Sequence, residues 1–136
     1  IVVFPALRVA ATGDLFARKW APLVDAANGG SASQFPATLD KAIAGIKDVD
    51  QLITGHATTS IGREGTFTSF SPVSKWSDLQ EYAAFTHALV DAARRAKASG
   101  KTADEALAGL KLPDAYRNYN MTNARADIQR VYEELK

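Results

Sequence analysis

Two short stretches, Leu7-Arg-Val-Ala-Ala-Thr-Gly-Asp-Leu-Phe16 and Gln51-Leu-Ile-Thr-Gly-His56, decide how this sequence is interpreted. Each begins with an apolar run typical of a β-strand and then places a polar side chain, Asp14 or His56, directly after a glycine. A segment with helical spacing joins them, which predicts a strand-helix-strand unit. Because ligands gather at the carboxyl ends of strands in open α/β sheets, we expect both side chains at one sheet edge.

The joining segment predicts a helix over residues 33–46. Its apolar side chains recur at helical spacing and share one face: Phe35, Leu39, Ile43 and Ile46. Pro36 must lie in the first turn, where its missing N–H does no harm, and this favours Ser33 over Ser31 as the N-cap. Strands are expected over residues 1–4, 7–12 and 50–54.

The second half of the chain reads differently. Residues 57–75 are rich in Gly, Ser and Thr without periodicity, which predicts a loop that is either variable or a wall facing the substrate. Helices follow, with apolar stripes over residues 79–93 and 122–135. Their predicted end signals are capping boxes at Ser77-x-x-Gln80 and Thr102-x-x-Glu105 and a C-terminal glycine, Gly100.

Bulk composition sets limits on the class of protein. At 136 residues, with 46% hydrophobic and 23% charged residues, the chain has the length and composition of one globular domain. The net charge of +1 gives no sign of a nucleic-acid partner. No apolar run approaches the ~18 residues of a membrane span, so no membrane partner is expected. The absence of cysteine excludes disulfides but leaves the compartment undetermined.

A carboxylate and an imidazole at one sheet edge suit zinc, iron or manganese. Each side chain has an ordinary alternative role: a turn cap for Asp14, and a structural or solvated histidine for His56. The chain has two histidines in all and no cysteine. Since a catalytic zinc usually takes three protein ligands and a water, the sequence predicts part of a metal site and not the whole of one.

Several pieces of sequence, taken in order, resemble the C-terminal half of a metallo-β-lactamase-fold hydrolase. They are Ala11-Thr-Gly-Asp14-Leu-Phe, Pro22-Leu-Val-Asp25, Asn28-Gly-Gly-Ser31, Thr38-Leu-Asp40 and Thr54-Gly-His56. The later runs are similar to the helical tail of many bacterial members: Asp78-Leu-Gln-Glu-Tyr82, Ala98-Ser-Gly-Lys-Thr-Ala-Asp-Glu105 and Val131-Tyr-Glu-Glu-Leu135.

The resemblance implies a fold and a set of roles. The fold is α/β, the C-terminal half of an αββα sandwich over residues 1–75 with a helical extension over residues 76–136. By the resemblance, Asp14 bridges two metals, zinc being the expected ion, and His56 completes the second coordination sphere. Asp14 stands where the zinc β-lactamases carry Cys or Ser, which points to the wider group of ester, thioester, lactone and phosphodiester hydrolases that act through a metal-bound hydroxide on small molecules.

Other side chains are weaker candidates. Asn28 is expected either to cap a turn or to polarise a substrate carbonyl beside the active site. Arg18 and Lys19 face either solvent or an anionic group. His87 lies four residues before Asp91, and this spacing predicts an ion pair between them on a helix. The aromatic residues near the candidate edge are expected to serve in core or lid packing or in substrate stacking: Trp20, Phe67, Phe70 and Trp76.

The family's main metal motif, His-x-His-x-Asp-His, does not occur in this chain, which begins at Ile1 in what reads as mid-strand. We therefore expect a fragment of a longer enzyme that is inactive alone and exposes an apolar sheet face over residues 1–4 and 9–11. That face would pair with the missing N-terminal half or with a second copy. The rival hypothesis is a non-catalytic structural or interaction domain that uses the 79–93 stripe as its partner surface.

Overall fold

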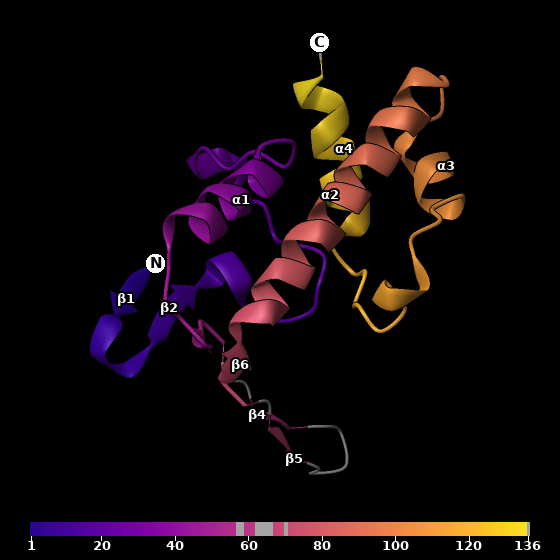
Figure 1. Cartoon of the computed structure of the whole chain (residues 1–136). Coiled ribbons are helices and arrows are strands. Elements are labelled where there is room, and N and C mark those ends of the chain that lie inside the picture. Colours follow the sequence, from indigo (N-terminus) through magenta and orange to yellow (C-terminus); the bar gives the residue numbers. More distant parts are fainter. Residues whose placement is uncertain (57–58, 62–66, 70, 136) are drawn as a thin grey trace.

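The computed structural model describes residues 1–56 and 71–135, together with the backbone of residues 59–61 and 67–69. Over these residues the protein is mixed α/β, with a four-stranded sheet, a two-stranded ribbon and four α-helices (Figure 1). The elements are β1 (Val2–Phe4), β2 (Val9–Gly13), α1 (Phe35–Gly45), β3 (Gln51–Thr54), β4 (Thr59–Ile61), β5 (Phe67–Ser69), β6 (Val73–Lys75), α2 (Trp76–Ala98), α3 (Ala103–Ala108) and α4 (Ala124–Glu134).

The main sheet has the strand order β1-β2-β3-β6. Its two central strands, β2 and β3, run parallel and are joined through α1, as the strand-helix-strand prediction requires. The outer strands β1 and β6 each pair antiparallel with their neighbour. Because β2 and β3 are parallel, their carboxyl ends meet at one edge of the sheet.

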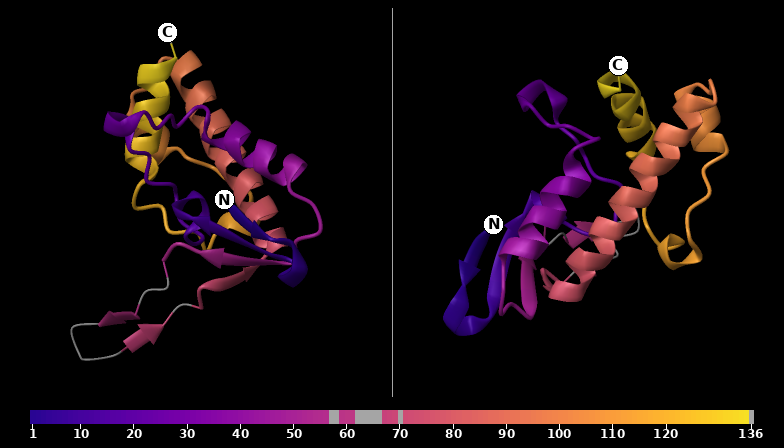
Figure 2. Two further views of the ribbon diagram at one scale, coloured as in Figure 1. Left: turned by 90° about the vertical axis from the view of Figure 1, so that its left-hand side faces the viewer. Right: turned by 45° about the horizontal axis from the view of Figure 1, so that its top comes forward.

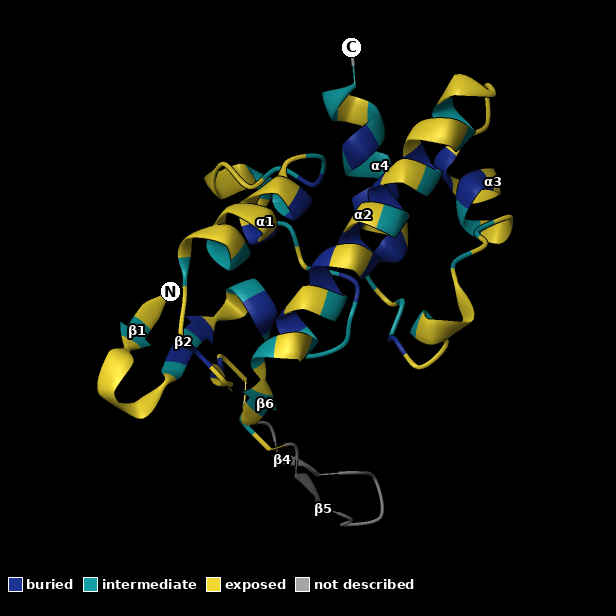
Figure 3. Ribbon diagram, viewed as in Figure 1, coloured by how far each residue is buried: buried dark blue, intermediate teal, exposed yellow. Residues whose placement is uncertain are grey.

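The two faces of this sheet differ sharply in burial (Figure 3). One face carries the row Val3, Ala10, Leu52 and Ser74, in which Ala10 and Leu52 are fully buried. The row on the other face is apolar across all four strands and largely exposed: Val2, Ala11, Ile53 and Val73. The exposed apolar sheet face expected from the sequence is therefore present, and it extends further than expected, onto β3 and β6.

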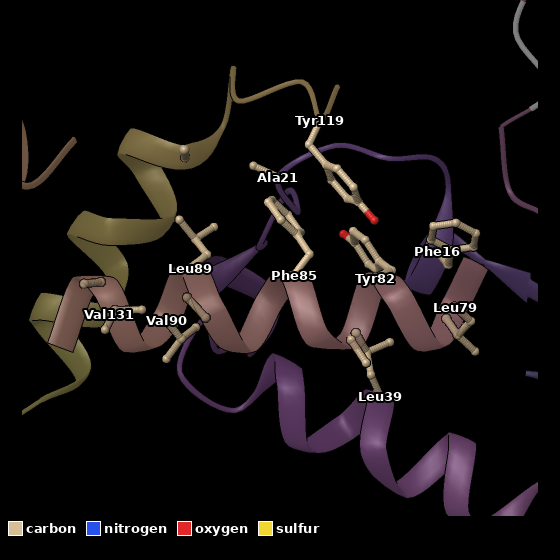
Figure 4. Packing of buried hydrophobic residues seen from close by; sticks show 14 of the residues in the cluster. Phe16, Ala21, Leu39, Leu79, Tyr82, Phe85, Leu89, Val90, Tyr119 and Val131 are labelled. Carbon is tan, nitrogen blue, oxygen red and sulfur yellow. The ribbon is translucent and has the colours of Figure 1, made fainter. Parts of the chain in front are cut away.

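Helix α2 is the centre of the helical region and packs against α1, α3 and α4 (Figures 1 and 2). Its apolar stripe is buried in a core rich in aromatic rings, where Phe85 stacks on Tyr119 with ring centroids 4.1 Å apart (Figure 4). The expectation that the 79–93 stripe is a free partner surface is wrong, because its members are covered: Leu79, Tyr82, Phe85, Leu89 and Val90.

One hydrophobic core crosses the expected boundary at residue 75. Leu39 and Leu52 from the first part and Leu79 and Ile128 from the second are all buried in the same cluster. The helices are therefore packed on the sheet and on α1 and do not form a loose tail. Of the described helices, none is both long and apolar enough to cross a bilayer.

The helix ends agree with the sequence in two places and differ in a third. The Thr102–Glu105 capping box is present, with reciprocal hydrogen bonds, and Gly100 has a positive φ of 74° just after α2. The predicted capping box at Ser77 is wrong, because α2 already begins at Trp76 and Ser77 lies inside the helix. The Asp78 carboxylate instead accepts the Lys75 backbone N–H at 2.9 Å.

The prediction of Ser33 as the α1 N-cap is also wrong. Helix α1 begins at Phe35, and no side chain caps it from position 34. The backbone N–H groups of Ala32 and Ser33 donate instead to the Glu134 carboxylate, each at 2.9 Å. Burial raises the pKa of Glu134, but hydrogen bonds from the Ser33 and Ser31 side chains, together with those from the two amides, outweigh it, so that the pKa is lowered. The hydrogen bonds also tie the end of α4 to the entry of α1.

The stretch 57–75 is not wholly a loop. Its last residues form β6, which pairs with β3 and completes the main sheet, and β4 and β5 form the antiparallel ribbon. Residues 57–58, 62–66 and 70 lie outside the described residues, as does the Phe67 side chain.

Candidate functional site

Asp14 and His56 meet at the carboxyl edge of the sheet. Strand β2 ends at Gly13 and β3 at Thr54, so that Asp14 follows its strand directly and His56 follows one residue later. The His56 Nε2 lies 3.1 Å from the Asp14 Oδ1. The two side chains singled out from the sequence are therefore in direct contact, across 42 residues of chain.

Gly13 allows the chain to turn sharply where β2 ends. Gly13 has φ 55° and ψ −143°, a conformation that side-chain-bearing residues rarely adopt. This turn directs the chain into a short 3₁₀ turn, Asp14–Phe16, whose last residue is buried. The Thr12 hydroxyl, also buried, lies within hydrogen-bonding distance of the Phe16 and Ile53 carbonyl oxygens. Asp14 is thus anchored by the buried residues on either side of it.

A second glycine allows the close approach of the two strand ends. The Gly55 N–H donates to the Gly13 carbonyl at 3.0 Å. A Cβ at position 55 would lie 2.6 Å from the Gly13 carbonyl carbon and would overlap the Asp14 carboxylate. Only a residue without a side chain fits there, so the contact between Asp14 and His56 depends on Gly55.

The Asp14–His56 pair is accessible to solvent. The Asp14 side chain is 80% exposed and that of His56 is 48% exposed. A carboxylate and an imidazole in contact can share a proton or bind a cation through their nitrogen and oxygen lone pairs. The described residues hold no cluster of three or more His, Cys, Asp or Glu side chains suited to a metal ion. Among the described residues, Asp14 and His56 are two candidate ligands, fewer than the three protein ligands that a catalytic zinc usually takes.

The pair lies on the wall of an open cavity of about 310 Å³, which we call the site cavity. A second hollow, of about 290 Å³, shares four of its lining residues: Ala17, Arg18, Trp20 and His56. The helical region contributes Tyr82 from α2 and Asn123 from the entry of α4 to the site cavity. The cavity is therefore built from the sheet edge, the loop after β2 and the helical region together.

Asn28, a candidate substrate-binding residue from the sequence, forms part of a turn outside the lining of the site cavity. It ends a 3₁₀ turn, Ala26–Asn28, and its side-chain amide donates to the Asp25 carboxylate at 2.7 Å. These hydrogen bonds lower the pKa of Asp25. Asn28 is not among the residues that line the site cavity or the neighbouring hollow, which agrees with the turn-forming alternative weighed from the sequence.

Lys19 lines the neighbouring hollow and is held there in a polar network. Its ammonium group lies 3.0 Å from a Glu81 carboxylate oxygen, and the Tyr119 hydroxyl donates to the same carboxylate at 3.1 Å. Burial, followed by the charge of Glu81, raises the pKa of Tyr119 well above its ordinary value, so this phenol stays neutral and donates. Lys19 therefore braces the loop after β2 against α2.

The second histidine takes a partner different from the one predicted. His87 Nε2 lies 2.7 Å from the Asp40 Oδ2 and so joins α2 to α1, whereas Asp91 pairs with Arg94. The local spacing rule fails at this position because α1 packs beside α2 and brings a carboxylate closer.

Tyr82 and Asn123 are wall residues that the sequence did not identify as such, whereas Trp20, which was expected near this edge, also lines the cavity. Tyr82 falls in the apolar stripe of α2 and reads as core, and its ring is in fact almost fully buried. Asn123 precedes the last helix and reads as a helix start. No spacing signal separates these roles, because the wall forms only when the helical region packs on the loop after β2. Trp76, by contrast, packs against the core, as one of the two alternatives expected.

Comparisons of the chain with protein-family models, with curated proteins and with solved structures gave no match.

Proposed function

We propose that this chain supplies two metal ligands, Asp14 and His56, to a metal-dependent hydrolase of the metallo-β-lactamase superfamily. The observation that carries the proposal is the 3.1 Å contact between these side chains at the carboxyl ends of adjacent parallel strands. A bound zinc, iron or manganese would supply Lewis acidity and an activated water for the hydrolysis of an ester, thioester, lactone or phosphodiester.

The donor chemistry of the pair fits such an ion. Carboxylate oxygen and imidazole nitrogen are ordinary zinc ligands, and both groups are open to solvent. In this reading Asp14 holds the metal and orients it through its anchored turn, and His56 completes one side of the coordination sphere. Two ligands are fewer than a catalytic zinc requires, so the chain by itself is expected to bind metal weakly and to be inactive.

The sheet supports the proposal that this domain is half of a larger αββα sandwich. An apolar row runs across all four strands on the face opposite the helices, with Val2 59%, Ile53 42% and Val73 50% exposed. Contiguous apolar surface of this kind marks an interface. We propose that a second sheet packs here, from an N-terminal half of the same enzyme or from a second copy of the chain.

The two histidines allow a direct test within one sample. Zinc is titrated into ¹⁵N-labelled chain while the imidazole ring resonances of both histidines are followed by NMR. We expect the His56 signals to shift or broaden at zinc concentrations that leave those of His87 unchanged, because only His56 faces a carboxylate at the sheet edge. Equal responses of both rings, or a response of His87 alone, would contradict the metal site.

The alternative is a non-catalytic interaction domain, and the exposed sheet face is the observation that favours it. Light scattering alone does not separate the two proposals, because both allow self-association. The zinc titration does separate them, because only the hydrolase proposal requires that His56 respond to zinc. A chain that dimerises through Ile53 and Val73 and shows no zinc response at His56 would support the interaction domain.

A further inference from the structure

A separate open hollow of about 220 Å³ lies in the helical region, where α3 packs against α2 (Figure 1). The end of α2, α3 and the segment after α3 form its walls. Small side chains from both helices line it, among them Ala92 and Ala96 of α2 and Ala106 of α3. The hollow shares no lining residue with the site cavity or with the hollow beside that cavity.

Three exposed cations converge on this hollow. Arg95 comes from the last turn of α2, Lys101 from the turn after it and Lys111 from the segment after α3. No carboxylate is present among the described residues that line it, so we call it the basic hollow. The net charge of the whole chain is +1, and positive charge is therefore concentrated here. A concave surface lined by charges of one sign attracts ions of the opposite sign.

The other cations of this region are already engaged. Arg94 lies 3.6 Å from the Asp91 carboxylate, and Arg125 lies 2.7 Å from that of Asp104. Lys97 donates to two carbonyl oxygens at the end of α4. The side chains of the three cations in the basic hollow, by contrast, form no ion pair or hydrogen bond with another described residue.

Local partners do not balance these three charges. Cations near the C-terminus of a helix can compensate its last carbonyls, but the Ala96 carbonyl already accepts the Ser99 and Lys101 backbone N–H groups, each at 3.1 Å. Glu105 in α3 accepts the N–H and hydroxyl of Thr102 at 2.8 and 2.9 Å. These hydrogen bonds are the main cause of its lowered pKa, and the Lys101 charge adds less.

Phosphate chemistry matches this arrangement. Arginine binds phosphate through a planar fork of donors, and lysine binds it as a point charge. One phosphate ester carries a charge of about −1.5 to −2 at pH 7, which leaves part of the charge of three cations unbalanced, whereas two linked phosphates balance it. A duplex nucleic acid usually needs roughly six to ten phosphate contacts, more than one hollow with three cations supplies.

We infer that the basic hollow binds a small ligand that carries two linked phosphate groups, held by Arg95, Lys101 and Lys111. This site is separate from Asp14 and His56 and does not depend on the proposed hydrolase function. It gives the helical region a ligand of its own.

The test titrates pyrophosphate into the full chain in EDTA, with sulfate as the control anion at equal ionic strength because salt screens exposed charges. Calorimetry gives the affinity, and ¹H–¹⁵N spectra locate the site. We expect saturable binding of pyrophosphate at least about tenfold tighter than that of sulfate. The amide signal of Gly109, which lines the basic hollow, should shift, whereas that of Gly55 at the sheet edge should not.

Charge variants test whether these particular cations bind the ligand. Lys101→Gln with Lys111→Gln should weaken pyrophosphate binding at least about tenfold. Lys41→Gln with Lys47→Gln removes the same charge from exposed positions outside the hollow and should leave the affinity unchanged. Equal losses in the two double variants would show that only the net charge matters, and would overturn the inference.

A shape variant tests whether the hollow itself is needed. Ala92→Leu keeps all three cations but fills part of the space between them, and we expect at least about fivefold weaker binding. Arg95→Lys should weaken binding less than Arg95→Gln does, because the lysine keeps the charge and loses only the fork. An unchanged affinity in Ala92→Leu would mean binding to an open charged surface and would contradict a built site.

Equal affinity for pyrophosphate and sulfate, or no saturable binding, would also overturn the inference. Two further probes are a duplex DNA oligomer and phosphatidylcholine vesicles that contain a phosphatidylinositol bisphosphate. If either binds through Lys101 and Lys111 while pyrophosphate does not, the partner is a macromolecule or a membrane and the small ligand is rejected. Because the titrations contain EDTA and are followed at Gly109, their result is independent of the zinc response of His56.

Discussion

The chain contains two histidine–aspartate pairs that look alike as chemistry and differ in how they are built. His56 and Asp14 lie 3.1 Å apart where two parallel strands end, on the wall of a cavity. His87 and Asp40 lie 2.7 Å apart between two packed helices and line none of the cavities described above. The distances alone would favour the second pair as the stronger interaction.

The difference lies in what holds each pair. The first depends on backbone geometry, since Gly13 takes a positive φ and Gly55 admits the neighbouring strand. The second depends on side chains that reach from one helix surface to the other. A pair held by backbone in a cavity suits a functional site, and a pair on helix surfaces suits a modest cross-link. A short His–Asp distance is therefore a poor criterion of function.

A third aspartate, Asp127, shows how a buried carboxylate without such a partner lowers the stability of the fold. Asp127 in α4 is 4% exposed, its Oδ2 has no hydrogen-bond partner among the described residues, and burial raises its pKa to about 8. Between pH ~4 and pH ~8 the unfolded chain has lost this proton while the folded chain keeps it, so stability falls as pH rises.

We therefore expect Asp127→Asn to stabilise the protein at neutral pH, by on the order of 3 kcal/mol, because it removes the proton-linked cost. Urea denaturation of both proteins at about pH 5 and about pH 7.5 measures this: the wild type should lose stability over that interval and the variant should not. Asp91→Asn, on the exposed side of α2, is the control. A wild-type stability that rises with pH would contradict the assignment.

The next largest effect should come from Gly55→Ala, which attacks the backbone that supports the first pair. The added Cβ overlaps the Gly13 carbonyl and the Asp14 carboxylate, and we expect a loss of about 2 kcal/mol in the free energy of unfolding. Gly45→Ala is the matched control, because nothing lies within 4 Å of a Cβ there. Equal urea midpoints for the two variants would show that the close approach is unimportant.

Metal affinity should separate the pairs directly. In the zinc titration followed at His56, Asp14→Ala is expected to weaken binding by at least about tenfold, since it removes a ligand, whereas Asp40→Ala should leave the affinity unchanged. Isothermal titration calorimetry provides an independent measure of both. If Asp40→Ala weakens zinc binding as much as Asp14→Ala does, the comparison between the pairs fails.

The smallest effect is expected from breaking the helix–helix pair alone. His87 and Asp40 are each about half exposed, so Asp40→Asn should cost less than about 1 kcal/mol of stability, as for other exposed ion pairs. Urea unfolding of the wild type and of the variant measures this difference. A loss well above that value would mean that this pair is structural in a way its exposure does not suggest.

The two pairs also show which contacts could be predicted from the sequence and which could not. The apolar runs that became β2 and β3, the helix between them and the two glycine–ligand dipeptides are local signals, and together they predicted that Asp14 and His56 share an edge. The partner of His87 was predicted from helical spacing and was wrong, because Asp40 approaches from another helix. Strand β6 was missed because three residues, Val73–Lys75, carry too little pattern and become a strand only by pairing with β3.

The sequence by itself determined the elements whose causes are local: the strand-helix-strand unit, the capping box at Thr102, the glycine after α2, and the placement of one possible ligand after each central strand. Only the tertiary structure decided which distant groups satisfy one another. Glu134 binds the amides before α1 from about a hundred residues away, and Tyr82 and Asn123 become cavity wall by packing on the loop after β2. Hydrogen-bonding groups and apolar surface must be satisfied by whatever lies nearest in space, and distance along the chain does not limit that choice.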